Sequence, residues 1–173
     1  MSYLCWAEFC KEGQEFVAIS NKLGDTWSWE EKNSSEGQSY LKYKQKVSDP
    51  VSQNLIQIEY HIVYSISYQV PIMYFQAHYS DGKMLNLDNV WQLFQFHKDS
   101  QYSREDMLSI LTQMEHPVLF KPFMCLHPCR TAEILEQTPL SRNRILTFIS
   151  IMGPYIQLNL DNRYGLECEN SNT

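Results

Sequence analysis

The stretch Ile56-Gln-Ile-Glu-Tyr-His-Ile-Val-Tyr-Ser-Ile-Ser-Tyr68 decides the fold class of this chain of 173 residues. An apolar or aromatic side chain stands at every second position, from 56 through to 68. Side chains two residues apart share one face of a strand, whereas a helix would scatter them around its axis. The pattern therefore predicts a β-strand over residues 56–68.

Shorter strands are expected before and after this one. Trp27 and Trp29 share a face in a short first strand, and residues 72–79 form a fourth strand that ends at Asp81-Gly82. Pro71 lies between the long strand and the fourth, where a residue without an N–H donor is typical of a strand boundary.

Residues 40–47 alternate between two kinds of side chain. One face carries the apolar residues Leu41, Tyr43 and Val47, and the other carries Lys42, Lys44 and Lys46. This is typical of a half-buried strand with a basic outer face. If the strand lies at a sheet edge, the lysines are candidates for binding a partner segment by strand addition; guarding the edge against aggregation is the alternative, and both roles stay open.

An amphipathic helix is expected over residues 3–22, ended by Gly24-Asp25. Its apolar positions recur on one helical face: Cys5, Phe9, Phe16, Ile19 and Leu23. Its polar face is acidic, with Glu8, Glu12 and Glu15. Membrane-inserting helices favour a basic polar face, so core packing is the preferred reading.

The second half of the chain predicts further helices around a long loop. Asp88 is expected to cap a short helix with Val90, Trp91 and Phe94, and Ser103 with Asp106 resembles a capping box before Met107, Leu108 and Leu111. Residues 115–129 contain three prolines and are expected to form an extended loop. A last helix over 142–152 precedes Gly153-Pro154.

Helix, four-stranded meander, long loop and helices predict an α+β fold. This is the element order of the ubiquitin-conjugating (E2-like) fold, an antiparallel four-stranded meander packed with flanking helices. We expect a single domain over 1–162 and a polar, frayed tail over 163–173.

The loop carries the stretch most informative about chemistry, Met124-Cys-Leu-His-Pro-Cys-Arg-Thr-Ala-Glu133. Pro128 fixes its own φ and favours an extended His127. Thr131 is expected to cap a helix that begins near Ala132, which would place partly positive N–H groups close to the Cys129 sulfur. Such a setting favours the thiolate and predicts a nucleophile.

Two other readings of Cys129 stay open on the residues alone. Most cysteines are small buried apolar residues. A zinc site is the second alternative, since Cys125, His127 and Cys129 alternate and His116 is nearby. The chain has no Cys-x2-Cys pair, which disfavours structural zinc, and nothing in it implies a cofactor.

Composition narrows the class of protein further. The formal net charge is −6, which disfavours nucleic-acid binding. No apolar run reaches membrane-spanning length, so no membrane span is expected. Five cysteines at irregular spacing argue against a disulfide framework and predict a reducing, cytoplasmic location.

Six short motifs, in order between Gly24 and Leu160, resemble the family of autophagy-related protein ten, E2-like conjugating enzymes. They are Gly24-Asp25-x-Trp27-x-Trp29, Glu59-Tyr60-His61-x-x-Tyr64 continuing through Tyr68-Gln69-Val70-Pro71 to Tyr74-Phe75, Asp81-Gly82 with Trp91, Glu115-His116-Pro117, Leu126-His127-Pro128-Cys129, and Gly153-Pro154 with Leu158-Asn159-Leu160.

The resemblance implies a route for acyl transfer. Cys129 would accept the ubiquitin-like protein autophagy-related twelve from the E1-like enzyme autophagy-related seven, and pass it to a lysine of autophagy-related five. Ordinary ubiquitin-conjugating enzymes have a His-Pro-Asn whose Asn aids the oxyanion, but here Val118 follows His116-Pro117.

The source of oxyanion stabilisation is therefore open. Tyr64 and Tyr68 are candidates if the long strand passes under the cysteine, with core packing as the alternative for both. Glu115 and His116 are candidates to orient a lysine or accept its proton, with a loop-stabilising hydrogen bond as the alternative for His116.

Two alternative functions remain in view. The sister E2-like enzyme, which conjugates a ubiquitin-like protein to phosphatidylethanolamine, shares the motif around Cys129. That family carries a long acidic insertion and a membrane-sensing amino-terminal helix, and this sequence shows neither. A non-catalytic E2-like adaptor is the other alternative.

Overall fold

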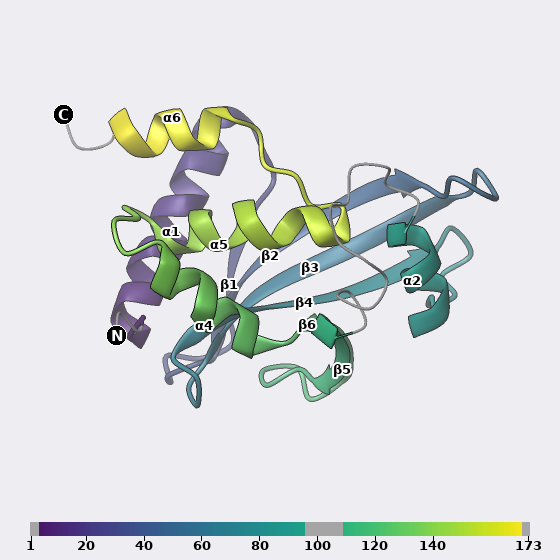
Figure 1. The fold of residues 1–173 in the computed structure, drawn as a ribbon, viewed down its shortest axis with the longest axis horizontal. Helices are drawn as coiled ribbons and strands as arrows, with labels where there is room; N and C mark the ends of the chain where they lie inside the picture. Colours follow the sequence, from purple (N-terminus) through teal and green to yellow (C-terminus); the bar gives the residue numbers. More distant parts are fainter. Residues whose placement is uncertain (1–3, 96–108, 171–173) are drawn as a thin grey trace.

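The computed structural model describes residues 4–95 and 109–170, and Figure 1 shows their arrangement. The expected helix start at Ser103 and Asp106 lies outside the described residues, as do Met107 and Leu108. Leu111, assigned to the same helix by its apolar pattern, instead begins a strand.

The described residues contain one antiparallel sheet of six strands, in the order β1-β2-β3-β4-β6-β5. The expected meander is its first four strands, and an additional hairpin pairs with β4 through β6. The α+β, E2-like prediction is confirmed, with a longer sheet. The strands are β1 (Ser28–Glu31), β2 (Ser39–Ser48), β3 (Leu55–Ser65), β4 (Val70–Tyr79), β5 (Leu111–Glu115) and β6 (Pro122–Leu126).

The central strand β3 is shorter than the alternation predicted. It ends at Ser65, because a tight turn closes there with a hydrogen bond from Gln69 N to Ser65 O of 2.7 Å and a positive φ of 53° at Gln69. Ile66 and Tyr68 continue the alternation but lie exposed in the turn. Pro71 is inside β4, opposite Tyr64.

β3 is covered on both faces along its second half. The alternating set from Ile56 to Tyr64 lies in the main apolar core, as the pattern predicted. On the opposite face, His61 and Val63 are buried too. A second apolar cluster covers them, and we call it the hairpin cluster: Tyr40, Val63, Ile72, Tyr74, Val118, Phe123 and Cys125, with Leu119 packed against it.

Helices cover the face of the sheet that carries the main core. Figure 1 shows α1, α4, α5 and α6 gathered at one end and α2 at the other. Phe94 of α2 packs against Phe75 of β4, with ring centroids 5.6 Å apart. The helices are α1 (Trp6–Leu23), α2 (Leu87–Gln95), α4 (Pro128–Gln137), α5 (Arg144–Met152), the 3-10 turn η1 (Gly153–Ile156) and α6 (Arg163–Asn170).

The helix ends follow from local chemistry. Gly24 ends α1 in the left-handed region at φ 73°, as expected. The expected cap at Asp88 is wrong: Asn86 occupies that role, because its side-chain oxygen accepts from Asn89 N at 2.8 Å. Asn143 caps α5 by accepting from Leu146 N at 2.9 Å.

The frayed tail expected over 163–173 is wrong for residues 163–170, which form α6 against α1. Tyr164 explains why, since its ring is buried and stacks on Phe16 at 5.1 Å. Its hydroxyl donates to Asp25 at 2.6 Å. A single buried aromatic in a polar segment was too weak a periodic signal to predict a helix.

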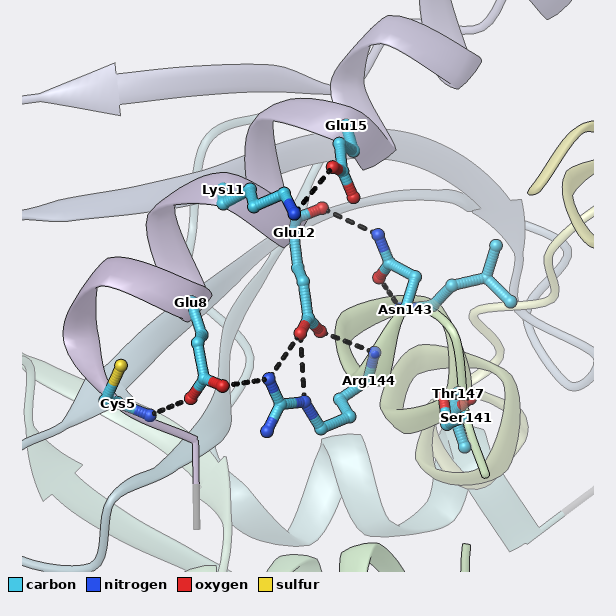
Figure 2. A network of polar contacts seen from close by, with 10 residues as sticks. Cys5, Glu8, Lys11, Glu12, Glu15, Ser141, Asn143, Arg144 and Thr147 are labelled. Atoms are coloured by element: carbon cyan, nitrogen blue, oxygen red, sulfur yellow. Dashed lines mark hydrogen bonds and ion pairs between the residues drawn. The ribbon is translucent and has the colours of Figure 1, made fainter. Parts of the chain in front are cut away.

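A partly buried ion pair fastens α1 to the start of α5 (Figure 2). Glu12 accepts from the Arg144 side chain at 2.9 and 2.5 Å and from Arg144 N at 2.6 Å, so its carboxylate also serves the α5 N-terminus. The Asn143 amide donates to the Glu12 carbonyl at 2.8 Å, and Glu8 adds a second carboxylate, 3.1 Å from Arg144. The acidic face of α1 thus points partly inward.

We expect Glu12→Gln to lower the free energy of unfolding by about 3 kcal/mol, since it leaves a largely but not fully buried guanidinium without its main partner. The matched control is Glu15→Gln on the same helix, whose exposed pair with Lys11 at 3.9 Å should contribute under about 0.5 kcal/mol. Urea unfolding of the two variants measures the difference. Equal losses would contradict a special role for the Glu12–Arg144 pair.

Candidate active site

Cys129 lies where a strand turns directly into a helix. The expected loop over 115–129 is wrong for much of its length, because it contains the end of β5, a turn and all of β6. After β6, His127 N donates to Ile110 O at 2.7 Å, and α4 begins at the next residue, Pro128. Cys129 is the second residue of α4, and its side chain is exposed.

His127, rather than Thr131, caps α4. His127 has φ −59° and ψ 131°, the extended conformation that Pro128 favours, and its Nδ1 accepts from Cys129 N at 3.3 Å. Proline fits the first helical position because its missing N–H would have had no intrahelical acceptor. The expected start near Ala132 is therefore wrong by one turn. Thr131 lies inside the helix, fully buried.

The thiol of Cys129 has a close side-chain neighbour, since His127 Nδ1 is 2.9 Å from Sγ. The sequence alone predicts His127 only as an extended residue and as part of the zinc alternative, and does not predict this contact. The available signal was the spacing: a cap residue followed by proline brings the second helical side chain back toward the cap.

The other cysteine of this segment has the opposite environment. Cys125 faces the hairpin cluster and is fully buried, and burial raises its thiol pKa to about 12. It stays protonated at neutral pH and is poorly suited to attack or to bind metal.

The residues of the zinc alternative are not brought together. His116 and Cys125 lie in or against the buried hairpin cluster, while His127 and Cys129 lie at the helix start. Within residues 4–95 and 109–170, no group of three or more His, Cys, Asp or Glu side chains is placed to hold a metal ion.

A chain of polar contacts runs through the sheet beneath the turn between β5 and β6. His116 Nδ1 accepts from the N–H groups of Val118 and Leu119, each at 3.2 Å, so this nitrogen carries no proton. Its Nε2 therefore donates to His61 Nδ1 at 3.0 Å, and His61 Nε2 donates to Glu59 at 2.8 Å. Every contact has one donor and one acceptor when both rings are neutral.

The Glu59 end of this series of polar contacts carries charged side chains from β2 and β3. The hydrogen bond from His61, with Lys44 and Lys42 nearby, lowers the pKa of Glu59 to about 2. Lys44 lies 2.8 Å and Lys42 3.9 Å from the Glu59 carboxylate. Two of the three lysines assigned to partner binding are thus engaged within the fold.

The structure places the expected supporting residues in four different surroundings. His116 is fully buried with both ring nitrogens engaged, which matches the loop-stabilising alternative, while Glu115 is exposed at the end of β5. Tyr64 is buried between Trp6 and Phe9, each ring 5.5 Å away, and burial raises its pKa. Tyr68 is half-exposed in the β3–β4 turn.

The chain has clear relatives. Residues 8–163 match the family model described as the autophagocytosis associated protein, active-site domain. The chain belongs to this family. Among curated proteins it is 31% identical to the ubiquitin-like-conjugating enzyme ATG10 of Homo sapiens, over 87% of each chain. It is 32% identical to ATG10 of Arabidopsis thaliana, over 59% of this chain and 49% of that one.

A third relative, ATG10 of Dictyostelium discoideum, is 26% identical over 61% of this chain and 53% of its own. As a member of this family the chain is an E2-like conjugating enzyme, a transferase of autophagy. None of the described helices is both long enough and apolar enough to cross a membrane.

We expect acid to destabilise the fold through His116. Burial, together with His61, lowers the pKa of His116 to about 3, well below the ordinary value near 6.5. Below pH 6.5 the unfolded chain therefore binds a proton at His116 that the folded chain does not bind. The contribution of neutral His116 to the free energy of unfolding is complete above pH 6.5 and is lost as pH falls. Urea unfolding should show a loss of about 2 kcal/mol between pH 6.5 and 5.

His116→Asn should have lower stability at pH 7 and a shallower pH slope in this window. Glu59, with its pKa of about 2, contributes its own loss only below about pH 4.5. The control is His78→Asn on β4, which should keep the slope of the unmodified chain. If His116→Asn leaves the pH slope of the free energy of unfolding unchanged, that slope comes from other groups.

Proposed function

We propose that this enzyme carries a ubiquitin-like modifier as a thioester on Cys129 and transfers it to a lysine of an acceptor protein. The observation that supports the proposal is the exposed thiol in the first turn of α4, with the His-Pro-Cys sequence before it. By resemblance, the modifier is autophagy-related twelve, the donor is the E1-like enzyme autophagy-related seven, and the acceptor is autophagy-related five.

The reaction is two acyl transfers. In the first, the Cys129 sulfur attacks the thioester carbonyl of the modifier on the donor enzyme; a new C–S bond forms, and the donor thiolate leaves. In the second, the lysine amine attacks the carbonyl on Cys129; a C–N bond forms, the C–S bond breaks, and the amine loses a proton. Free thiols are needed throughout, which fits a reducing compartment such as the cytoplasm.

Each attack builds negative charge on a carbonyl oxygen. The first N–H groups of a helix have no intrahelical acceptor. In α4 that of His127 binds Ile110 O, Pro128 has none, and that of Cys129 binds His127 Nδ1, which leaves the N–H of Arg130, in the same turn as the Cys129 sulfur. We propose this backbone donor as the oxyanion stabiliser. Supporting roles for Glu115, His116, Tyr64 and Tyr68 stay predictions, and the burial of His116 and Tyr64 favours structural roles for these two.

The lipid-conjugating alternative is less well supported. A membrane-sensing helix must free its polar face for lipid headgroups, whereas Glu8 and Glu12 of α1 bind Arg144. The adaptor alternative leaves the exposed Cys129 and its histidine contact without a purpose.

We expect Cys129→Ala to abolish the adduct formed with autophagy-related seven, autophagy-related twelve and ATP, and Cys129→Ser to trap a stable ester. Cys5→Ala is the matched control, since Cys5 is also exposed at a helix start. Gel electrophoresis with and without reducing agent distinguishes thioester from ester. An adduct that survives in Cys129→Ala would move the nucleophile to another cysteine.

A partner surface is proposed on β2. Within the described residues, β1 pairs with β2 only over residues 39–42, which leaves the edge of 43–48 open for strand addition. Lys46 lies on this exposed part, while Lys44 and Lys42 are drawn toward Glu59.

We expect Lys46→Glu to weaken binding to autophagy-related five or seven several-fold at low salt and less at high salt, because exposed charges are screened. Lys83→Glu, an exposed lysine in the turn after β4, is the control. Calorimetric titration measures both. Unchanged affinity in Lys46→Glu would favour the alternative, in which the lysines protect the open strand edge against aggregation.

A further inference from the structure

His127 and Cys129 share a contact that differs from an ordinary helix cap. An N-cap side chain accepts from a backbone N–H, and His127 Nδ1 does so from Cys129 N at 3.3 Å. The same nitrogen lies closer to the sulfur, at 2.9 Å from Sγ. This is shorter than sulfur contacts usually are, so the Sγ–Nδ1 contact is the main one.

The donor and acceptor at this contact follow from the backbone. A backbone N–H can only donate, so Nδ1 is the unprotonated nitrogen of the ring and Nε2 carries the proton. The remaining hydrogen that can point at Nδ1 is that of the Cys129 thiol. The resting site is therefore a thiol hydrogen-bonded to a neutral imidazole, with the base already placed.

We propose that His127 is the general base of the first acyl transfer: its Nδ1 takes the proton of the Cys129 thiol, leaving a thiolate beside an imidazolium. The sulfur then attacks the incoming thioester carbonyl, the new C–S bond forms, and the old one breaks. The proton on Nδ1 goes to the departing thiolate or to water, which returns His127 to its neutral form.

The second transfer runs through the same nitrogen in reverse. When the lysine amine displaces Cys129, the sulfur leaves as a thiolate beside His127. An imidazolium formed from solvent donates to it, and the resting thiol–imidazole pair is restored. His127 does not take the lysine proton in this scheme. The proposal rests on the proposed function only for these transfers, since the proton transfer between Cys129 and His127 belongs to the chain itself.

The surroundings of His127 hold the ring in place for this role. Its backbone N–H is fixed to Ile110 O at 2.7 Å, and Pro128 restricts the backbone on the other side. The side chain is only partly buried, so Nε2 can exchange protons with water, as a base that turns over must. The fully buried His116 has no such path.

One substitution can separate the role of His127 as a helix cap from its role as a base. His127→Asn keeps a side-chain oxygen that accepts from Cys129 N, because asparagine is among the preferred N-cap residues, but an amide does not accept a proton at neutral pH. His127→Ala removes both functions. The urea midpoint of His127→Asn should match that of the unmodified chain, which shows that the helix start is intact.

The test is alkylation of the whole chain by iodoacetamide from pH 5.5 to 9.5, with each cysteine followed by peptide mass spectrometry. Cys5, also exposed, is the internal control. Attack by the sulfur requires removal of the thiol proton, and hydroxide is scarce at pH 7, so His127→Asn should slow alkylation of Cys129 roughly tenfold there. The deficit should vanish at pH 9.5, where hydroxide removes the proton, and Cys5 should be unaffected.

Equal rates at Cys129 in the unmodified chain and His127→Asn at every pH would overturn the base assignment. A deficit in His127→Asn that persists at pH 9.5 would also overturn it, because it would show altered access rather than a missing base. Single-turnover thioester formation should show the same pH-dependent deficit. Alkylation that depends on His127, with no thioester formed, would instead count against the proposed function but not against proton transfer from Cys129 to His127.

Discussion

The hairpin that leads to Cys129 joins the rest of the sheet through a very short ladder. In the described residues β6 pairs with β4 at two register positions, Tyr74 with Cys125 and Phe75 with Met124. Two pairs cannot by themselves fix a hairpin, because an edge with so few hydrogen bonds frays and slips. The position of Cys129 therefore depends on what packs around the hairpin.

The hairpin cluster supplies this packing, and the hydrogen bonds from His116 through His61 to Glu59 fix its register. Phe123 and Cys125 of β6 bury against Tyr74 and Val63, and the turn before β6 is tied by His116 to His61 and Glu59. A polar chain within an apolar cluster tolerates one arrangement of donors and acceptors, so it selects one register where apolar contacts alone would allow several. The main core under the helices then needs only to hold α4 in place, and the Glu12–Arg144 pair fixes α5 beside it.

Local chemistry made the meander and the end of α1 predictable, while the missed helix at 163–170 and the missed strand β6 depend on contacts distant in sequence. The strand at 56–64 and the end of α1 at Gly24 follow from patterns a few residues long. Nothing in 163–170 shows that Tyr164 reaches Phe16 and Asp25. Likewise, three prolines in 115–129 signal a loop, and β6 exists because Tyr74 and Phe75 offer it a partner. The motif predicts the role of Cys129, but the contact between its sulfur and His127 required coordinates.

Histidine serves two purposes in this fold, and burial decides between them. His61 and His116 are sealed in the sheet, where the neutral ring passes hydrogen bonds from backbone to carboxylate and a second proton would break the chain. His127 makes a similar ring contact but stands at the end of a strand, with its far nitrogen open to exchange. A residue that only holds structure gains from isolation from water, and a residue that moves a proton must return it to water. The change from β6 to α4 at Pro128 places a histidine of the second kind two residues from an exposed sulfur, and this solvent access is what the proposed proton transfer requires.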